Sequence, residues 1–288
     1  FMPVTVVTDT THYMPRDLMD AYGIEQVSLY VKDGDELTRE SDMADFQAFY
    51  DRLRSRGELP TTSQPSVGDF LEVWEPILES GSDIVSVHLS GGISGTVESA
   101  RQAANEVAAG GSQRRVEVVD SKSVCAGLGF IAIAAASAAR GGRDVEAVRD
   151  RAQQAADENR IWFSLDTLEY VQRGGRIGKA QAWVGGALKV KPILTMDGEV
   201  VPVERVRTSK RRFERMIELL RERHDAGATV YGIQHIQSPD EAEALAEAGR
   251  EIFGTDPMVI SEAGPVIGTY GGPGMLGVGG IRPELLES

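Results

Sequence analysis

The first 160 residues alternate between short strand-like and longer helix-like segments, and this alternation constrains the fold more than any other feature of the chain. Apolar strand-like segments lie at about 4–8, 26–31, 84–89 and 116–119. Helical patterns lie near 15–22, 43–56, 67–80, 95–109, 127–139 and 144–158. Such an order is typical of a parallel sheet covered by helices. The sequence therefore predicts a Rossmann-like α/β/α domain over residues 2–160.

The pattern changes after residue 160. Strand-like pieces are joined by short turns such as Asp197-Gly198, and they read IWFSLDTLEYV (161–171), KPILTM (191–196) and EVVPVERVRT (199–208). Hairpins indicate an antiparallel or mixed sheet. Helical patterns near 208–223 and 239–251 would cover it. We predict a second α/β domain with a mixed or antiparallel sheet over residues 161–288.

Composition excludes several classes of protein. A net charge of −14 over 288 residues disfavours nucleic acid as a partner, because nucleic-acid binders carry a basic face. A single cysteine, Cys125, allows no disulfide framework and fits a reducing cytoplasm. The small-residue run 125–139 is too short to span a bilayer and predicts a buried helix instead. We expect a cytoplasmic protein without a membrane segment.

The histidines give no sign of a metal site. None of the four has a metal-pair spacing, and they are His12, His88, His224 and His235. No metal and no cofactor is therefore expected.

Four loops rich in hydroxyl groups follow the predicted parallel strands. They are TDTTH (8–12), PTTSQPS (60–66), SGGISGT (90–96) and DSKS (120–123). Ligands of open parallel sheets sit beyond the carboxyl ends of the strands. These loops are therefore expected to converge on a binding site.

Ser94 lies where the helix of 95–109 begins. The free N–H groups and positive dipole of a helix start can hold an anion without a charged side chain, although Ser94 can equally serve only as a helix cap. The loop matches neither a P-loop nor G-x-G-x-x-G, and GGRIGKA (174–180) lacks the P-loop hydroxyl. A serine hydrolase that uses Ser94 with His12 as its base is a second interpretation, which no motif supports.

Five ordered motifs resemble those of the DegV family of fatty-acid-binding proteins. They are TSQPS (62–66), SGT (94–96), RGGRI (173–177), KPIL (191–194) and GPVIGTYGGPG (264–274). The resemblance covers nearly the whole chain. It implies a DegV-like two-domain fold that holds one long-chain fatty acid in a tunnel between the domains. The protein would be a carrier that presents the carboxylate to a separate ATP-dependent fatty acid kinase, which makes the acyl phosphate.

The resemblance also implies the residues of the site. The hydroxyls of Thr62 and Ser94, the backbone N–H near Gly95 and the phenol of Tyr270 would bind the carboxylate, and the further candidates are Ser63, Asp9 and Ser90. The family usually has histidine at the position of Tyr270, and a phenol still donates a hydrogen bond. Uncharged donors suit a carboxylate that must remain nucleophilic.

Two features leave alternatives open. Arg173 either faces the kinase partner or the phosphoryl group that is transferred, or it only complements the end of a helix that Gly174 caps in the left-handed conformation. Residues of the small-residue helix, such as Phe130 and Ala134, and of strands near Ile193 and Ile267 either line the tunnel or form ordinary core. A regulatory protein that binds another small acid is a further alternative function.

Overall fold

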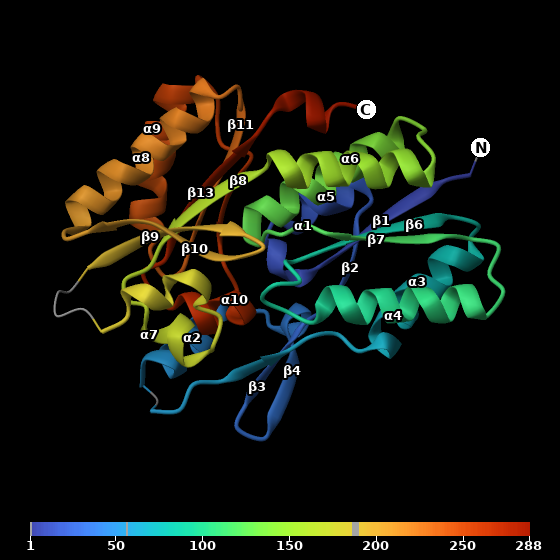
Figure 1. Ribbon diagram of the computed structural model, residues 1–288, viewed down its shortest axis with the longest axis horizontal. Helices are drawn as coiled ribbons and strands as arrows, with labels where there is room; N and C mark the ends of the chain where they lie inside the picture. Colours follow the sequence, from blue (N-terminus) through green and yellow to red (C-terminus); the bar gives the residue numbers. More distant parts are fainter. Residues whose placement is uncertain (1, 56, 186–189) are drawn as a thin grey trace.

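The computed structural model describes residues 2–55, 57–185 and 190–288, and its first half is built on a parallel sheet of four strands (Figure 1). In sheet order the strands are β2 (Glu25–Val27), β1 (Val4–Asp9), β6 (Asp83–His88) and β7 (Val116–Asp120). Every neighbouring pair is parallel. The predicted parallel sheet is confirmed.

Helices cover both faces of this sheet. Helices α5 (Cys125–Arg140) and α6 (Val145–Glu158) pack on one face, with α1 (Arg16–Tyr22) beside α5, and α3 (Val67–Glu79) and α4 (Thr96–Ala109) pack on the other. Helix α3 begins with a capping box. Ser66 Oγ accepts the backbone N–H of Asp69 at 3.1 Å, and the Asp69 carboxylate accepts the Ser66 N–H at 2.8 Å.

The second half is built on a mixed sheet of six strands. In sheet order they are β10 (Glu199–Val206), β9 (Lys191–Asp197), β8 (Arg160–Ser164), β13 (Leu276–Ile281), β11 (Val230–His235) and β12 (Val259–Glu262). Only the β11–β12 pair is parallel among these neighbours. Helices α8 (Ser209–Asp225) and α9 (Pro239–Phe253) pack against this sheet (Figure 1). The predicted mixed sheet is confirmed.

Helix α5 packs between the two sheets. It contacts β1 and β6 of the parallel sheet and β8, β11 and β13 of the mixed sheet. Every residue from Cys125 through Ala138 is buried, which explains the small side chains, because only these let a helix approach a sheet on each side. The largest cluster of buried apolar residues extends from Val6 to Leu285 and thus includes both halves. The division between residues 160 and 161 stays a prediction.

The segment 26–31 was predicted as one strand and is two. The strand β3 (Tyr30–Asp33) leaves the parallel sheet and pairs with β4 (Glu36–Arg39) and β5 (Thr61–Ser63) in a separate antiparallel sheet. Gly34 allows the β3–β4 turn through a left-handed φ of 64°. An Asp-Gly pair is a strong hairpin signal that the strand prediction overlooked. Helix α2 (Phe46–Ser55) follows this hairpin.

Two other predicted strands are wrong in part. The segment 161–171 forms β8 only as far as Ser164, and its end belongs to α7 (Glu169–Arg173). The cap of α7 also differs, since Gly174 has φ −75° and the left-handed residue is Gly175, with φ 72°. Ile267 lies in helix α10 (Pro265–Gly271), because Pro265 occupies a first-turn position that favours a helix start.

Candidate functional site

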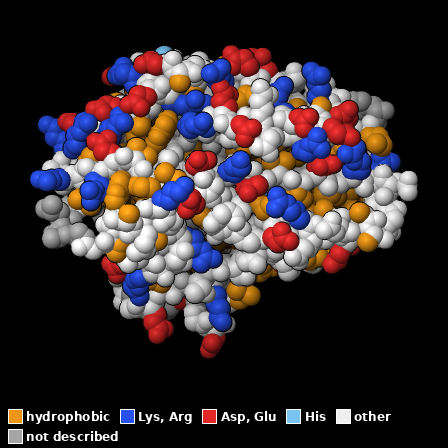
Figure 2. Space-filling view, in the orientation of Figure 1, with side chains coloured by type: hydrophobic (Ala, Val, Ile, Leu, Met, Phe, Trp, Pro, Cys, Tyr) orange, Lys and Arg blue, Asp and Glu red, His pale blue; other side chains and the backbone are white. Residues whose placement is uncertain are grey.

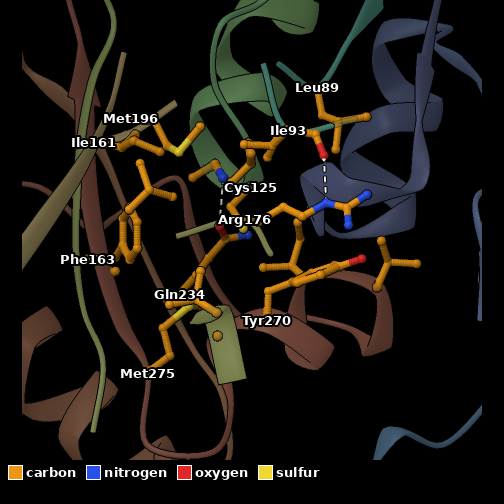
Figure 3. Close-up of a pocket in the computed structure, with 18 of the residues that line it drawn as sticks. Leu89, Ile93, Cys125, Ile161, Phe163, Arg176, Met196, Gln234, Tyr270 and Met275 are labelled. Carbon is orange, nitrogen blue, oxygen red and sulfur yellow. Dashed lines mark hydrogen bonds between the residues drawn. The ribbon is translucent and has the colours of Figure 1, made fainter. Parts of the chain in front are cut away.

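An apolar cavity lies between the two sheets and takes its lining from both halves of the chain (Figure 3). Leu89, Ile93 and Cys125 contribute from the first half, and Ile161, Phe163, Met196 and Met275 contribute from the second. The polar side chains of Thr62, Ser94, Arg176 and Tyr270 also line it. Figure 3 draws Tyr270 and Arg176 on one side of the space and Ile161, Phe163 and Met196 on the other. The cavity thus has an edge with hydroxyl groups and a cation, and the rest of its lining is mostly apolar, with Gln64 and Gln234 as further polar residues.

The crevice between the halves is therefore not filled by the protein's own side chains. The cavity has a volume of about 100 Å³. A single buried water needs only about 10–15 Å³, so the space is larger than a one-water void. Protein interiors contain few voids larger than one water, so this space is more than a packing defect.

Of the small-residue helix, only its first turn reaches the cavity. Cys125 and Ala126 line the space, whereas Phe130 and Ala134 lie in the core, as does Ile193. Ile267 does line the cavity, from helix α10. Only the N-terminal end of α5 lines the cavity. The sequence pattern is equally apolar along the helix, so it could not distinguish this end from the rest.

Thr62 and Tyr270 meet at the polar edge although 208 positions separate them. Thr62 lies in β5, opposite Val31 of β3, and Tyr270 lies near the end of α10. Their hydroxyl groups share a hydrogen bond. Both side chains are half-buried. A carboxylate oxygen that accepted from both hydroxyls would replace this bond.

Ser94 lies one residue before the helix cap. Helix α4 begins at Thr96 with Gly95 as its N-cap, so Ser94 is not the cap. Its Oγ accepts the Thr96 N–H at 3.2 Å and hydrogen bonds to the Thr96 hydroxyl at 2.8 Å. Ser94 lines the cavity, whereas Gly95 lines a more open groove beside it. Ile93, Ser94 and Arg176 line both spaces, so the groove adjoins the polar edge of the cavity.

Arg176 is a charged lining residue that the sequence analysis missed. Its guanidinium carbon lies 5.3 Å from the centre of the Tyr270 ring, and its Nε donates to the Ile93 carbonyl at 3.2 Å (Figure 3). It stands in the RGGRI motif, three positions after the arginine that was chosen. A site of uncharged donors alone, as the resemblance implied, does not include it. A cation therefore stands beside the three hydroxyl groups.

Arg173 lies outside the cavity lining. It donates to the Gly57 carbonyl at 2.7 Å and pairs with Glu169 at 3.4 Å, which ties α7 to the loop after α2. Its side chain is 42% exposed and so remains accessible to a partner. Its role at a kinase stays a prediction.

The three further candidates also lie outside the cavity lining. Ser63 is exposed and donates to the Gln64 carbonyl at 3.3 Å. Ser90 is buried and donates to the Gly198 carbonyl, so it anchors the β9–β10 turn. Asp9 is buried and holds the loop at the end of β1, as described next. None of the three is placed to touch a molecule in this cavity.

Asp9 accepts hydrogen bonds from three neighbours. They are the Thr11 N–H at 3.0 Å, the Leu89 N–H at 2.9 Å and the His88 ring at 3.1 Å. Burial alone would raise the pKa of Asp9, but the hydrogen bond and charge of His88, together with the bonds from Thr11 and Leu89, lower it overall. Asp9 therefore remains ionised and anchors the loop.

The geometry gives no support to a serine hydrolase at Ser94. Its hydroxyl is bonded to Thr96, while the two ring nitrogens of His12 are bonded to Gln26 at 3.0 Å and to the Met14 N–H at 2.8 Å. A Ser86–His88–Asp9 chain does have the order of a catalytic triad, with distances of 2.6 and 3.1 Å. All three residues are fully buried, so a substrate cannot reach them.

Two other features are absent from the part of the chain that the structure describes. No group of three histidine, cysteine, aspartate or glutamate side chains is placed to hold a metal ion. No described helix is both long and apolar enough to cross a membrane.

Residues 3–282 match the sequence profile of the DegV family, which is described as a family of uncharacterised proteins. The chain is 39% identical over 278 residues to a DegV domain-containing protein of Streptomyces coelicolor, covering 96% of this chain and 97% of that protein. It is 36% identical over 280 residues to protein DegV of Bacillus subtilis, covering 96% of this chain.

Solved structures are similar over the same length. A DegV family protein of Thermus thermophilus, described for its fatty acid binding, is 33% identical with a TM-score of 0.86, covering 98% of this chain and 100% of that one. DegV of Bacillus subtilis, described as a fatty acid binding protein, is 34% identical with a TM-score of 0.86, covering 97% of this chain and 99% of that one.

Proposed function

The chain belongs to the DegV family, and we propose that it binds one long-chain fatty acid in the cavity between its two sheets. The observation that carries the proposal is the cavity itself, a mostly apolar space with hydroxyl groups and Arg176 at one edge. A fatty acid has the same division between a hydrocarbon tail and a carboxylate. Fatty acid binding in the similar proteins of Thermus thermophilus and Bacillus subtilis supports this assignment.

The energetics favour such a ligand. Burial of the fourteen or so methylenes of a sixteen-carbon acid contributes on the order of 11 kcal/mol, at about 0.8 kcal/mol each. Desolvation of one hydrogen-bonded carboxylate costs several kcal/mol and is outweighed. Met196 and Met275 line the cavity with unbranched side chains that adjust readily, which helps a long tail to fit.

At the polar edge, the carboxylate would take the place of the hydrogen bond between Thr62 and Tyr270. Both hydroxyls would then donate to its oxygens, with Ser94 and the free N–H groups at the start of α4 on the adjoining side. Arg176, beside Tyr270, adds a charge that favours the ionised acid. No cofactor takes part in this binding.

We further propose that the protein is a carrier rather than an enzyme, and that it presents the carboxylate to a separate ATP-dependent kinase. The groove beside the cavity gives a partner access to the head group, because Ser94 and Arg176 line both. In that reaction a carboxylate oxygen attacks the γ-phosphorus of ATP. A bond forms between this oxygen and the phosphorus, and the bond between the phosphorus and the bridging oxygen of ADP breaks. The products are the acyl phosphate and ADP.

Lipid identification tests the binding proposal. Native mass spectrometry of the purified protein should show one added mass in the fatty acid range, which solvent extraction then identifies. Thr62→Ala combined with Ser94→Ala should lower the retained fraction, whereas Ser63→Ala, outside the cavity, should not. A different small acid in place of the lipid would favour a regulatory protein. Covalent labelling by a serine-reactive phosphonate would favour a hydrolase.

A reconstituted reaction tests the carrier proposal. With ATP and a fatty acid kinase subunit, Arg173→Ala should stop acyl-phosphate formation while the lipid stays bound. Arg16→Ala, at another exposed arginine, is the control and should leave the yield unchanged. Loss of lipid from the Arg173 variant would instead give Arg173 a purely structural role.

A further inference from the structure

Strand β13 carries three glycines within six residues although it lies in the middle of the mixed sheet. Its sequence is LGVGGI, and it pairs with β8 on one side and β11 on the other. Glycine weakens the interior of a strand, so each one calls for a physical reason. A glycine can allow a neighbour to pack closely, it can adopt an unusual backbone conformation, or its missing side chain can leave space for a ligand.

Close packing accounts for two of the three. A Cβ at Gly279 would lie 2.7 Å from Cγ2 of Ile161, and a Cβ at Gly280 would lie 3.0 Å from the Val230 carbonyl oxygen. Real Cβ atoms do not make the first contact, and the second is tighter than most. At both positions glycine lets a neighbour approach.

Gly277 has neither reason. A Cβ there would lie 3.7 Å from the Gln234 carbonyl oxygen and 3.9 Å from Cβ of Phe163, which are ordinary contact distances. Its backbone is not in the left-handed region. Gly277 does line the apolar cavity. The third reason therefore remains, which is that the missing side chain leaves space in the cavity.

The register of the sheet defines that space. Gly277 lies directly opposite Phe163 of β8 and directly opposite Gln234 of β11, so the three residues form one row on the same face of the sheet. Phe163 and Gln234 both line the cavity. A side chain at position 277 would therefore project between them, into the cavity.

Gln234 cannot turn aside to make room. Its Oε1 accepts the Ala126 N–H at 2.6 Å, and its Nε2 donates to the His12 carbonyl and to Ser261 Oγ, each at 3.0 Å. The residue is buried, so breaking these bonds would leave polar groups unpaired. The bonds also use both N–H groups of the amide, so neither is left to donate to a polar substituent on a ligand. The Gln234 side chain is therefore held in place, and the size of the residue at position 277 decides how wide the cavity is at this row.

We infer that Gly277 sets the width of the cavity at this row and thereby the length of the acyl chains that the protein accepts. This inference rests on the proposed fatty-acid binding. The row Phe163–Gly277–Gln234 is the part of the floor that an unbranched, unsubstituted tail crosses. A larger residue at 277 would end the space at this row. Chains long enough to pass it would then be excluded, while shorter chains would still bind.

A series of substitutions at Gly277 tests the inference. Gly277→Ala, Gly277→Val and Gly277→Leu are titrated with saturated acids of eight to eighteen carbons by displacement of a fluorescent fatty acid. Affinity for long chains should fall in that order, and a leucine that displaces about three methylenes should weaken binding about fifty-fold. Affinity for the shortest acid should change little. The melting temperature without ligand should stay near that of the wild type.

Two controls make the result decisive. Gly279→Ala, on the same face two residues away, should lower the melting temperature because its Cβ meets Ile161. Phe163→Ala added to Gly277→Leu should restore long-chain binding, since it opens the opposite side of the row. If the leucine variant changed the affinity for all chain lengths by the same factor relative to the wild type, or did not change it at all, the inference would be overturned. A wild-type protein that binds no fatty acid would overturn the proposed function instead.

Discussion

The two sides of helix α10 use polar side chains in opposite ways. On one side Tyr13, Glu40 and Tyr50 are buried, and their hydrogen bonds hold the start of the helix. Glu40 Oε2 accepts the Val266 N–H at 2.7 Å and the Tyr13 hydroxyl at 2.8 Å. On the other side Tyr270 shares a single half-buried hydrogen bond with Thr62 at the edge of the cavity. We call these the closed side and the cavity side.

The closed side and the cavity side differ in how costly it is to break their hydrogen bonds. Polar groups on the closed side are away from water, so losing a partner costs the full desolvation of the other group. The hydroxyls on the cavity side can exchange their bond for a ligand or water at little cost. Since the same helix carries both sets, the closed side fixes where Tyr270, Val266 and Ile267 meet the cavity.

Glu40→Gln should have the largest effect on stability among the changes proposed here. Burial raises the pKa of Glu40 from 4.5 to about 7. The folded state therefore prefers the protonated carboxyl, and this contribution to stability is complete below pH 4.5 and is lost as the pH rises through about 7. Glutamine copies the protonated form. At pH 9 the variant should be more stable than the wild type by about 3 kcal/mol.

Urea unfolding at pH 5 and pH 9 measures this difference. The two proteins should differ little at pH 5, since Glu40 is then mostly protonated. Burial raises the pKa of Tyr13 and of Tyr50 well above 10, so neither phenol titrates in this range. A gap that stays constant between the two pH values would show that Glu40 does not titrate in the folded protein as its burial requires.

Gly268→Ala should disturb the closed side more than Gly271→Ala disturbs the cavity side. A Cβ at Gly268 would lie 2.2 Å from the Tyr50 hydroxyl, which is held to the Ala263 carbonyl at 2.5 Å. We expect a loss of about 2 kcal/mol from this overpacking. A Cβ at Gly271 first meets the sulfur of Met275 at 3.0 Å, and this flexible side chain can move into the cavity. The cost there should stay under about 1 kcal/mol.

Chemical unfolding of both variants at one pH provides the comparison. Lipid binding should also differ between them, since Met275 lines the cavity and Tyr50 does not. Equal losses of stability would mean that the two sides of α10 are packed with similar rigidity.

Much of this arrangement follows from the sequence. Parallel strands end at one edge of a sheet, so the loop that carries Ser94 could be placed at the edge where the cavity lies from the strand–helix alternation alone. The mixed sheet followed from the Asp197-Gly198 turn. Thr62 and Tyr270, by contrast, were singled out through the family resemblance, because no local pattern joins residues 208 positions apart.

Other features could not be predicted because they depend on long-range contacts. Glu40 stands in the polar stretch TRESD, which is typical of a solvated loop, yet it is buried by contacts with Val266, 226 positions away. Arg176 reaches the cavity only because Gly175 turns the chain through a left-handed φ of 72°. Local sequence gives the residue types of such sites, but their burial is decided by tertiary packing.

The smallest and most discriminating change removes one hydroxyl from either side of α10. Tyr270→Phe takes a donor from the proposed carboxylate site and leaves Thr62 half-buried, where water can replace the lost partner. Binding of hexadecanoate should weaken about tenfold, and stability should change by less than about 0.5 kcal/mol.

Tyr13→Phe removes the same atom from the closed side, where Glu40 loses a donor and the Ile267 N–H loses its acceptor at 3.2 Å. That variant should lose about 1 to 1.5 kcal/mol of stability yet keep its affinity for the lipid once folded. Displacement titration measures the lipid affinity of both variants, and urea unfolding measures their stability. If Tyr270→Phe lost stability and kept its affinity, while Tyr13→Phe lost affinity and kept its stability, Tyr270 would support the fold rather than the ligand.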